Sequence, residues 1–227
     1  MNQRQKQRID TQEKILLAAL ETFATVGFSE ASSYKIARKA NIQQGLLTYH
    51  FPNKEILWKA VTEHLFSRVR AEVPDCLDHQ GNSSADRARR WIGHFVRFAA
   101  RNPVLMRFMI ENNVSHDERL DWIVPRYVQP GFEVFCRHFP KIDASEQPHA
   151  FYIFLGASSA IFASRLEFEK LCGFDPTDEK RVDDHVRIMT HLMLNYSSSG
   201  TDRVAVSAAS FEDLKSGKQV VPTHRRQ

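Results

Sequence analysis

Hydrophobic residues along most of the chain recur at intervals of three and four, the spacing of one face of an α-helix. Leu16, Leu20 and Phe23 mark the first such run, and Gly27 ends it. Alternating runs typical of β-strands are nearly absent. The pattern therefore predicts an all-α protein of about nine helices, at residues 10–27, 32–39, 43–50, 53–74, 84–101, 103–113, 117–139, 145–171 and 177–196.

Two features interrupt this pattern. Pro125 and Pro130 fall inside the seventh helix, and because proline lacks a backbone N–H group we expect a kink or a split there. After Tyr196 the chain becomes polar, with little to bury, so residues 197–227 are predicted to form a disordered tail.

The second and third helices are short and are joined by Ala40-Asn41-Ile42, which is the size of a helix-turn-helix. Leu47 and Phe51 lie one turn apart, so we expect both to pack inward. The opposite face then presents Gln44 and Thr48. A glutamine can bond an adenine edge, and a threonine can offer its hydroxyl to a base or its methyl to a thymine. The third helix is therefore predicted to read DNA.

Charge supports this interpretation. The chain has 227 residues and a net charge of +4, and the first 54 residues, with eight basic and four acidic side chains, already carry +4. The basic segment at residues 2–8 is expected to follow the DNA backbone as an arm. Asn53 is expected to cap the next helix and Lys54 to bind a phosphate beside it.

The segment from Ile15 to Val61 resembles the DNA-binding domain of the TetR/AcrR family of bacterial repressors. The matching runs are Ala18-Ala19-Leu20-Glu21-Thr22-Phe23 with Gly27-Phe28, Ile36-Ala37-Arg38-Lys39-Ala40, and Tyr49-His50-Phe51 with Asn53-Lys54-Glu55. Leu46 stands where the family usually has threonine, and Thr48 where it usually has tyrosine. The operator sequence is therefore not carried over.

The resemblance implies a helix-turn-helix domain at residues 1–52 and a ligand-sensing and dimerisation domain at 53–196. It implies a repressor that binds a palindromic operator in double-stranded DNA as a homodimer and is released by a small molecule. The aromatic residues of the middle helices predict that this effector is apolar or aromatic. From the residues and the resemblance together, the side chains expected to contact DNA are Ser32, Ser33, Tyr34, Gln43, Gln44, Gly45, Thr48, Tyr49, His50 and Lys54.

Aromatic residues crowd the middle helices, with polar residues among them, which is typical of a small-ligand pocket. The predicted pocket residues are Trp91, Phe95, Phe98, Met109, Asn113, Trp122, Arg126, Phe151 and Phe154. The last two helices carry small residues and an apolar stripe, which favours a four-helix interface between two copies over packing within one domain. The predicted interface residues are Ser159, Phe162, Val182, Val186, Met189 and Met193.

Other functions remain open at this point: an activator of the same family, or a helical adaptor or ligand-binding protein without DNA binding. The sequence has no nucleophile elbow, phosphate-cradling glycine loop or zinc spacing, so we predict no enzyme, metal or cofactor. Three widely spaced cysteines indicate free thiols in a reducing compartment. Neither a signal peptide nor a membrane span is expected, which predicts a cytoplasmic protein.

Overall fold

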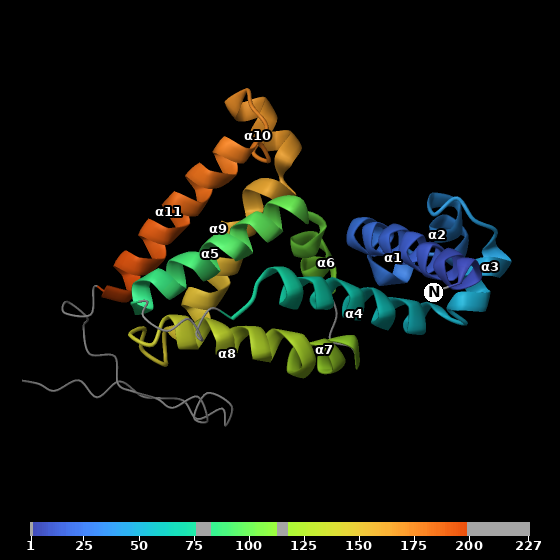
Figure 1. The fold of residues 1–227 in the computed structure, drawn as a ribbon, viewed down its shortest axis with the longest axis horizontal. Helices are drawn as coiled ribbons and strands as arrows, with labels where there is room; N and C mark the ends of the chain where they lie inside the picture. The colour runs from blue at the N-terminus through green and yellow to red at the C-terminus, as the bar shows by residue number, and fades with distance from the viewer. Residues whose placement is uncertain (1, 76–82, 113–117, 199–227) are drawn as a thin grey trace, which may run out of the picture.

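The computed structural model describes residues 2–75, 83–112 and 118–198 (Figure 1). Over these ranges the chain is helical and contains no strand, which confirms the all-α prediction. The elements are α1 (Gln3–Glu30), α2 (Ser33–Lys39), α3 (Gln44–His50), α4 (Lys54–Glu72), α5 (Ser84–Arg101), α6 (Val104–Asn112), α7 (Glu118–Ile123), the π-helical turn η2 (Val124–Val128), α8 (Gln129–His138), α9 (Gln147–Ala163), α10 (Arg165–Cys172) and α11 (Glu179–Ser198).

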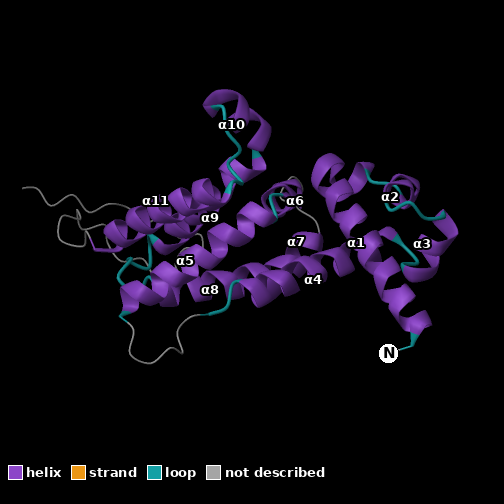
Figure 2. Ribbon diagram, turned by 45° about the horizontal axis from the view of Figure 1, so that its top comes forward, coloured by secondary structure: helices purple, strands orange, loops and turns teal. Residues whose placement is uncertain are grey.

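The helix predicted at 117–139 is split, as its two prolines indicated. Pro125 stands at the start of η2 and Pro130 at the start of α8. The helix predicted at 145–171 also breaks, at Ser164, so that α10 becomes a separate helix that projects from the body in both views (Figures 1 and 2). The sequence did not predict this second break.

The first helix begins earlier than expected. Asn2 accepts a hydrogen bond from the Gln5 backbone at 2.8 Å, and the Gln5 side chain accepts one from the Asn2 backbone at 3.2 Å. This capping box starts α1 at Gln3, so the basic segment expected to precede the first helix is itself helical. Its contact with DNA stays a prediction. Gly27, with φ of 73°, interrupts α1 where the sequence predicted its end.

One buried core joins the N-terminal helices to the rest of the chain. It contains Phe23 of α1, Ile36 of α2 and Leu47 of α3, and continues through Trp58 of α4 to Phe108 of α6. Helix α1 packs directly against α6, and α4 runs from α3 into the larger helical part (Figure 1). The core therefore passes without a break across the predicted domain boundary between residues 52 and 53, and that division stays a prediction.

A second core lies among α5, α8, α9 and α11. Trp91 and Phe95 of α5 both contact the Phe154 ring of α9, with ring centroids 5.0 and 4.9 Å apart. Phe135 of α8 lies 5.8 Å from the same ring. Helix α11 packs along α5 and α9 and closes this core (Figure 2).

Only the first two residues of the predicted disordered tail, 197–227, fall within the described ranges. Ser197 and Ser198 belong to α11, and residues 199–227 lie outside the described residues. Cys136 and Cys172 are free thiols, as predicted for the cysteines, whereas Cys76 is outside the described ranges.

His138, at the end of α8, is a buried histidine whose ring stacks on Trp91 at 5.1 Å. Burial lowers its pKa from 6.5, and this outweighs the opposite effect of Asp75, whose Oδ1 lies 3.2 Å from Nε2. The folded protein thus binds a proton at His138 less readily than the unfolded chain. The stability that comes from keeping His138 neutral is fully present above pH 6.5, the pKa of the unfolded chain. It is lost as the pH falls from there through the lower pKa of the folded protein.

We therefore expect the free energy of unfolding to fall between pH 7.5 and 5.5, and to fall less in His138→Phe. Urea denaturation at the two pH values measures both changes. His50, His64 and His185, whose pKa values are also lowered by burial, add to this pH dependence in both proteins. Identical pH dependences of the native protein and the variant would contradict the assignment.

Candidate nucleic-acid interface

The turn between α2 and α3 sets the angle between the two short helices. Asn41 adopts a left-handed conformation, with φ of 54°, which asparagine tolerates better than most residues. The Ile42 N–H group donates to the Ala37 carbonyl at 3.0 Å, and the Asn41 N–H group donates to Arg38 at 3.2 Å. These two bonds satisfy carbonyls at the end of α2 and turn the chain into α3.

Helix α3 is oriented by two buried side chains, as predicted. Leu47 is 2 % exposed and Phe51 is 8 % exposed, and both lie in the core with α1 and α2. Gln44 and Thr48, on the other side of the helix, are exposed. The hydrogen-bonding face of α3 is therefore free to approach another molecule.

The remaining residues on this surface differ in exposure and in the hydrogen bonds that they already make. Gln43, Gly45 and Tyr49 are exposed, and a Cβ atom on Gly45 would meet nothing within 4 Å. The Thr48 hydroxyl donates to the Gln44 carbonyl at 3.2 Å. This leaves the methyl group and the oxygen lone pairs of Thr48 for a contact, and makes its hydroxyl proton unavailable in this conformation.

His50 is half-buried beside Tyr49, with ring centroids 5.3 Å apart. Burial, and to a smaller extent the charge of Arg8, lower the pKa of His50 below 6.5. The ring is therefore neutral at pH 7 and can offer a hydrogen bond to a phosphate but no charge.

At the start of α2, Ser32 is the N-cap, and its hydroxyl accepts from the Lys35 N–H group at 3.2 Å. Ser33 is half-buried, and Tyr34 is largely exposed. Of these three predicted DNA contacts, Ser32 and Tyr34 are therefore the exposed ones.

Lys54 has a different place from the one predicted. Its ammonium group donates to the carbonyls of Phe28, Ser29 and Ala31 at 2.8, 3.1 and 3.1 Å, and lies 4.4 Å from the centre of the Phe28 ring. Its three N–H groups are thus engaged within the protein, and in the structure Lys54 clamps the α1–α2 connection to α4 instead of pointing to a phosphate. Asn53 caps α4 as predicted, accepting from the Ile56 N–H group at 2.8 Å.

A second cation reaches the same ring from the larger helical part. The Arg119 guanidinium group of α7 lies 3.8 Å from the centre of the Phe28 ring and 6.0 Å from that of Trp58. No local sequence pattern predicts this contact, because the residues lie far apart in the chain. It fixes α7 against the base of the helix-turn-helix.

The predicted pocket residues do not surround one cavity. Trp91, Phe95, Phe151 and Phe154 pack in the second core, whereas Phe98, Met109 and Trp122 belong to the first. Arg126 is exposed, with its guanidinium group over the Trp122 ring at 5.1 Å, and Asn113 lies outside the described residues. Because these side chains divide between two cores, the pocket expected at this place stays a prediction.

The predicted dimer residues also face inward. Ser159, Phe162, Val182, Met189 and Met193 are buried in the single chain, and Val186 is half-buried. The apolar stripe therefore packs within its own domain. The predicted interface between two copies is wrong for these residues. The exposed apolar residues of α9 and α11 are Tyr152, Ile153, Ile188, Leu192 and Tyr196.

Comparison with known proteins agrees with the fold. Residues 15–61 match the sequence model of the bacterial regulatory proteins of the tetR family. This segment of the chain is thus similar to the helix-turn-helix domain of that family.

Solved structures of TetR-like proteins extend the likeness to most of the chain. A TetR-like transcriptional regulator from Rhodococcus sp. RHA1 is 19 % identical, with a TM-score of 0.61 over 83 % of this chain and 96 % of that one. A putative fatty acid metabolism regulator from Clostridium perfringens is 18 % identical, with a TM-score of 0.63 over 86 % and 100 %. AibR, solved with isovaleryl coenzyme A and operator DNA, is 17 % identical, with a TM-score of 0.62 over 81 % and 97 %. These likenesses establish the fold.

Two further properties concern the described ranges only. None of their helices combines the length and the apolar character needed to cross a lipid bilayer. They also hold no group of three or more His, Cys, Asp or Glu side chains placed to bind a metal ion.

The clamp formed by Lys54 gives a stability prediction. Lys54→Met keeps most of the aliphatic chain and removes all three hydrogen bonds, so we expect the free energy of unfolding to fall by about 1–3 kcal/mol. Chemical denaturation followed by circular dichroism measures this. Lys35→Met is the matched control, because exposed Lys35 makes a single bond, to the Glu30 carbonyl at 3.2 Å. Equal losses in the two variants would contradict the clamp.

Proposed function

We propose that the protein is a ligand-responsive repressor that binds a palindromic operator as a homodimer. The observation that carries the proposal is the orientation of α3: Leu47 and Phe51 are buried, so Gln44 and Thr48 face outward together. Helix α3 has seven residues. At about 1.5 Å per residue it is short enough to enter a major groove about 12 Å wide.

In this proposal some exposed side chains contact bases and others bind phosphates. Gln44 reads a base, since a glutamine amide can bond both polar groups on the major-groove edge of adenine. Thr48 offers its methyl group to a thymine. Tyr34, Tyr49 and neutral His50 bond phosphates, which positions the helix without reading sequence. Arg4, Lys6 and Arg8, exposed on the first turns of α1, supply positive charge near the duplex.

The proposed dimer interface is moved from the buried stripe to the exposed face of the same two helices. Tyr152 and Ile153 of α9 are 65 % and 62 % exposed, and Ile188 and Leu192 of α11 are 46 % and 52 % exposed. Nothing lies within 4 Å of a Cβ atom placed on Gly156 of α9, so a partner helix has room to approach there. A second copy that presents the same face would cover this apolar surface in an isologous four-helix interface.

Response to a ligand would pass through the contacts between the two parts of the chain. Arg119 of α7 stacks on Phe28, and a Cβ atom on Gly27 of α1 would lie only 3.3 Å from Glu111 Oε2 of α6. Helices α6 and α7 therefore cannot shift without moving the base of the helix-turn-helix. A ligand that favours another position of these helices would weaken DNA binding, and DNA would weaken ligand binding by the same factor. AibR, which was solved with a coenzyme A ester and operator DNA, supports a small-molecule effector for this chain.

The proposal also places the protein in the cytoplasm, where it would meet its operator.

If the protein were a helical adaptor without DNA binding, it would have no affinity for any duplex. The proposed regulator should instead bind a duplex selected from a random pool, with affinity that falls steeply as salt rises. Selection followed by a salt titration tests the function as a whole.

Gln44→Ala tests the base-reading role. We expect the variant to lose about 1–3 kcal/mol of discrimination at one base pair in each half of the selected sequence, because it lacks the two amide hydrogen bonds to adenine. Parallel selections with the native protein and the variant give the base frequencies directly.

Gln129→Ala is the control for this experiment, because Gln129 is an exposed glutamine at the start of α8, far from α3 along the chain. It should select the same sequence as the native protein. If Gln44→Ala also kept the native sequence preference, the assignment of Gln44 to a base would be wrong.

Ile153→Arg tests the proposed interface. The side chain is exposed, so the single chain should still fold, whereas two facing arginines near the interface axis should prevent association. We expect sedimentation velocity to give the mass of one chain, and operator affinity to fall because the two half-sites are no longer bound together.

Ile110→Arg on α6 is a matched control, since Ile110 is 53 % exposed and lies on a helix outside the proposed interface. This variant should remain dimeric. A native protein that sediments as a single chain, or an Ile153→Arg variant that still pairs, would overturn the interface without affecting the base-reading test.

A further inference from the structure

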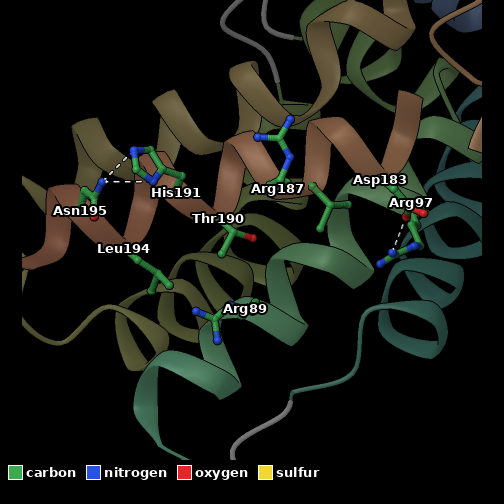
Figure 3. Close-up of a pocket in the computed structure, with 9 residues that line it drawn as sticks. Arg89, Arg97, Asp183, Arg187, Thr190, His191, Leu194 and Asn195 are labelled. Atoms are coloured by element: carbon green, nitrogen blue, oxygen red, sulfur yellow. Dashed lines mark hydrogen bonds and ion pairs between the residues drawn. The ribbon is translucent and has the colours of Figure 1, made fainter. Parts of the chain in front are cut away.

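A groove opens between α5 and α11. The two helices approach closely at Gly93, where a Cβ atom would lie 3.7 Å from Val186 Cγ1. The groove has a volume of about 550 Å³, which is within the range of small-molecule sites. Figure 3 shows its lining: the Arg97–Asp183 pair lies at one end and Asn195 at the other.

Thr190 of α11 lines this groove with an unused polar group. Thr190 is only 8 % exposed, and its Oγ1 atom has no hydrogen-bond partner among the residues that the structure describes. Other helical threonines in this chain avoid that cost by donating to the carbonyl four residues earlier, as Thr22 and Thr62 do at 2.7 and 3.0 Å. An enclosed hydroxyl without a partner indicates a ligand that supplies one.

Cationic side chains stand along both edges of the groove. Arg89 of α5 pairs with Asp86 at 2.8 Å, and Arg187 of α11 pairs with Asp184 at 3.3 Å. Both pairs join residues three apart on one helix, and the two arginine side chains are 55 % and 73 % exposed. Exposed pairs of this kind contribute little, so either guanidinium group can turn to a ligand anion at small cost.

The groove also offers apolar and neutral polar contacts. Val186 and Leu194 of α11 provide apolar surface along its lining. At one end, the Asn195 amide nitrogen lies 3.0 Å from His191 Nε2 and holds the imidazole ring in place (Figure 3). The site therefore combines an apolar wall with cationic edges.

We propose that this groove binds a small organic anion with an apolar body. The body lies on Val186 and Leu194, and the anionic group is held by Arg187 and Arg89. The Thr190 hydroxyl, which is buried in the unliganded structure, turns to donate a hydrogen bond to an acceptor atom of the ligand. The site is separate from the aromatic core of α5, α8 and α9.

The groove is also separate from the proposed dimer face. Thr190 follows Ile188 by two residues, which is about 200° around the helix. The side chains of Thr190 and Ile188 thus lie on nearly opposite flanks of α11. Binding here can be measured without DNA, so its outcome is independent of the proposed operator.

The experiment uses the full chain and 8-anilinonaphthalene-1-sulfonate, an apolar aromatic anion whose fluorescence rises on binding. We expect saturable binding of one probe per chain that weakens as salt rises. Uncharged N-phenyl-1-naphthylamine should bind about tenfold more weakly, because it lacks the charge-assisted bonds to arginine.

Three variants locate the bound probe, with circular dichroism to confirm that each is folded. Arg187→Gln should weaken sulfonate binding about tenfold. Thr190→Val, which keeps the shape and removes the hydroxyl, should weaken it about threefold or more. Lys170→Gln on α10 removes an exposed charge outside the groove and should leave binding unchanged. Absence of binding, equal binding of the charged and uncharged probes, or full affinity in Arg187→Gln and Thr190→Val would overturn the proposal.

Discussion

Burial of Leu47 and Phe51 is the constraint on which the DNA-binding surface depends. Each side chain contributes about 1.5–3 kcal/mol when it leaves water, and both lie on one side of a helix of only seven residues. Turning α3 by a single position, about 100°, would expose one of them and move Gln44 or Thr48 toward the core. The rotational setting of α3 is therefore fixed by packing, and the outward direction of Gln44 and Thr48 follows from it.

The same core that holds α3 also joins it to the rest of the chain. Trp58 of α4 is fully buried, and its ring lies 6.2 Å from that of Phe108 and 5.7 Å from that of Trp122. Phe28, near the end of α1, lies under cations from α4 and α7. These contacts make the helix-turn-helix a continuation of the larger helical part, which is the physical basis for the proposed coupling between effector and operator.

The sequence predicted features that depend on near neighbours in the chain. Helical periodicity identified Leu47 and Phe51, and the missing N–H groups of Pro125 and Pro130 predicted the split before α8. Periodicity did not predict the Asn2–Gln5 capping box, because residues 2–8 contain no apolar side chain.

Features that depend on distant segments were predicted less well. Periodicity correctly marked Met189 and Met193 as apolar contact residues, but it cannot say whether the covering helix belongs to the same chain. Aromatic density around Trp91 likewise cannot distinguish a filled core from a pocket. Lys54 was expected to bind a phosphate. Its actual carbonyl partners lie more than twenty residues earlier in the chain, so no local pattern points to them.

Hydroxyl-radical and methylation footprinting on a duplex selected by the protein tests the central claim most directly. With α3 of two copies in successive major grooves, the account predicts two protected regions on one face of the duplex, about 34–36 Å apart, with protected major-groove base atoms at the centre of each. A single protected region, or protection of the sugar–phosphate backbone with every major-groove base atom left reactive, would contradict it.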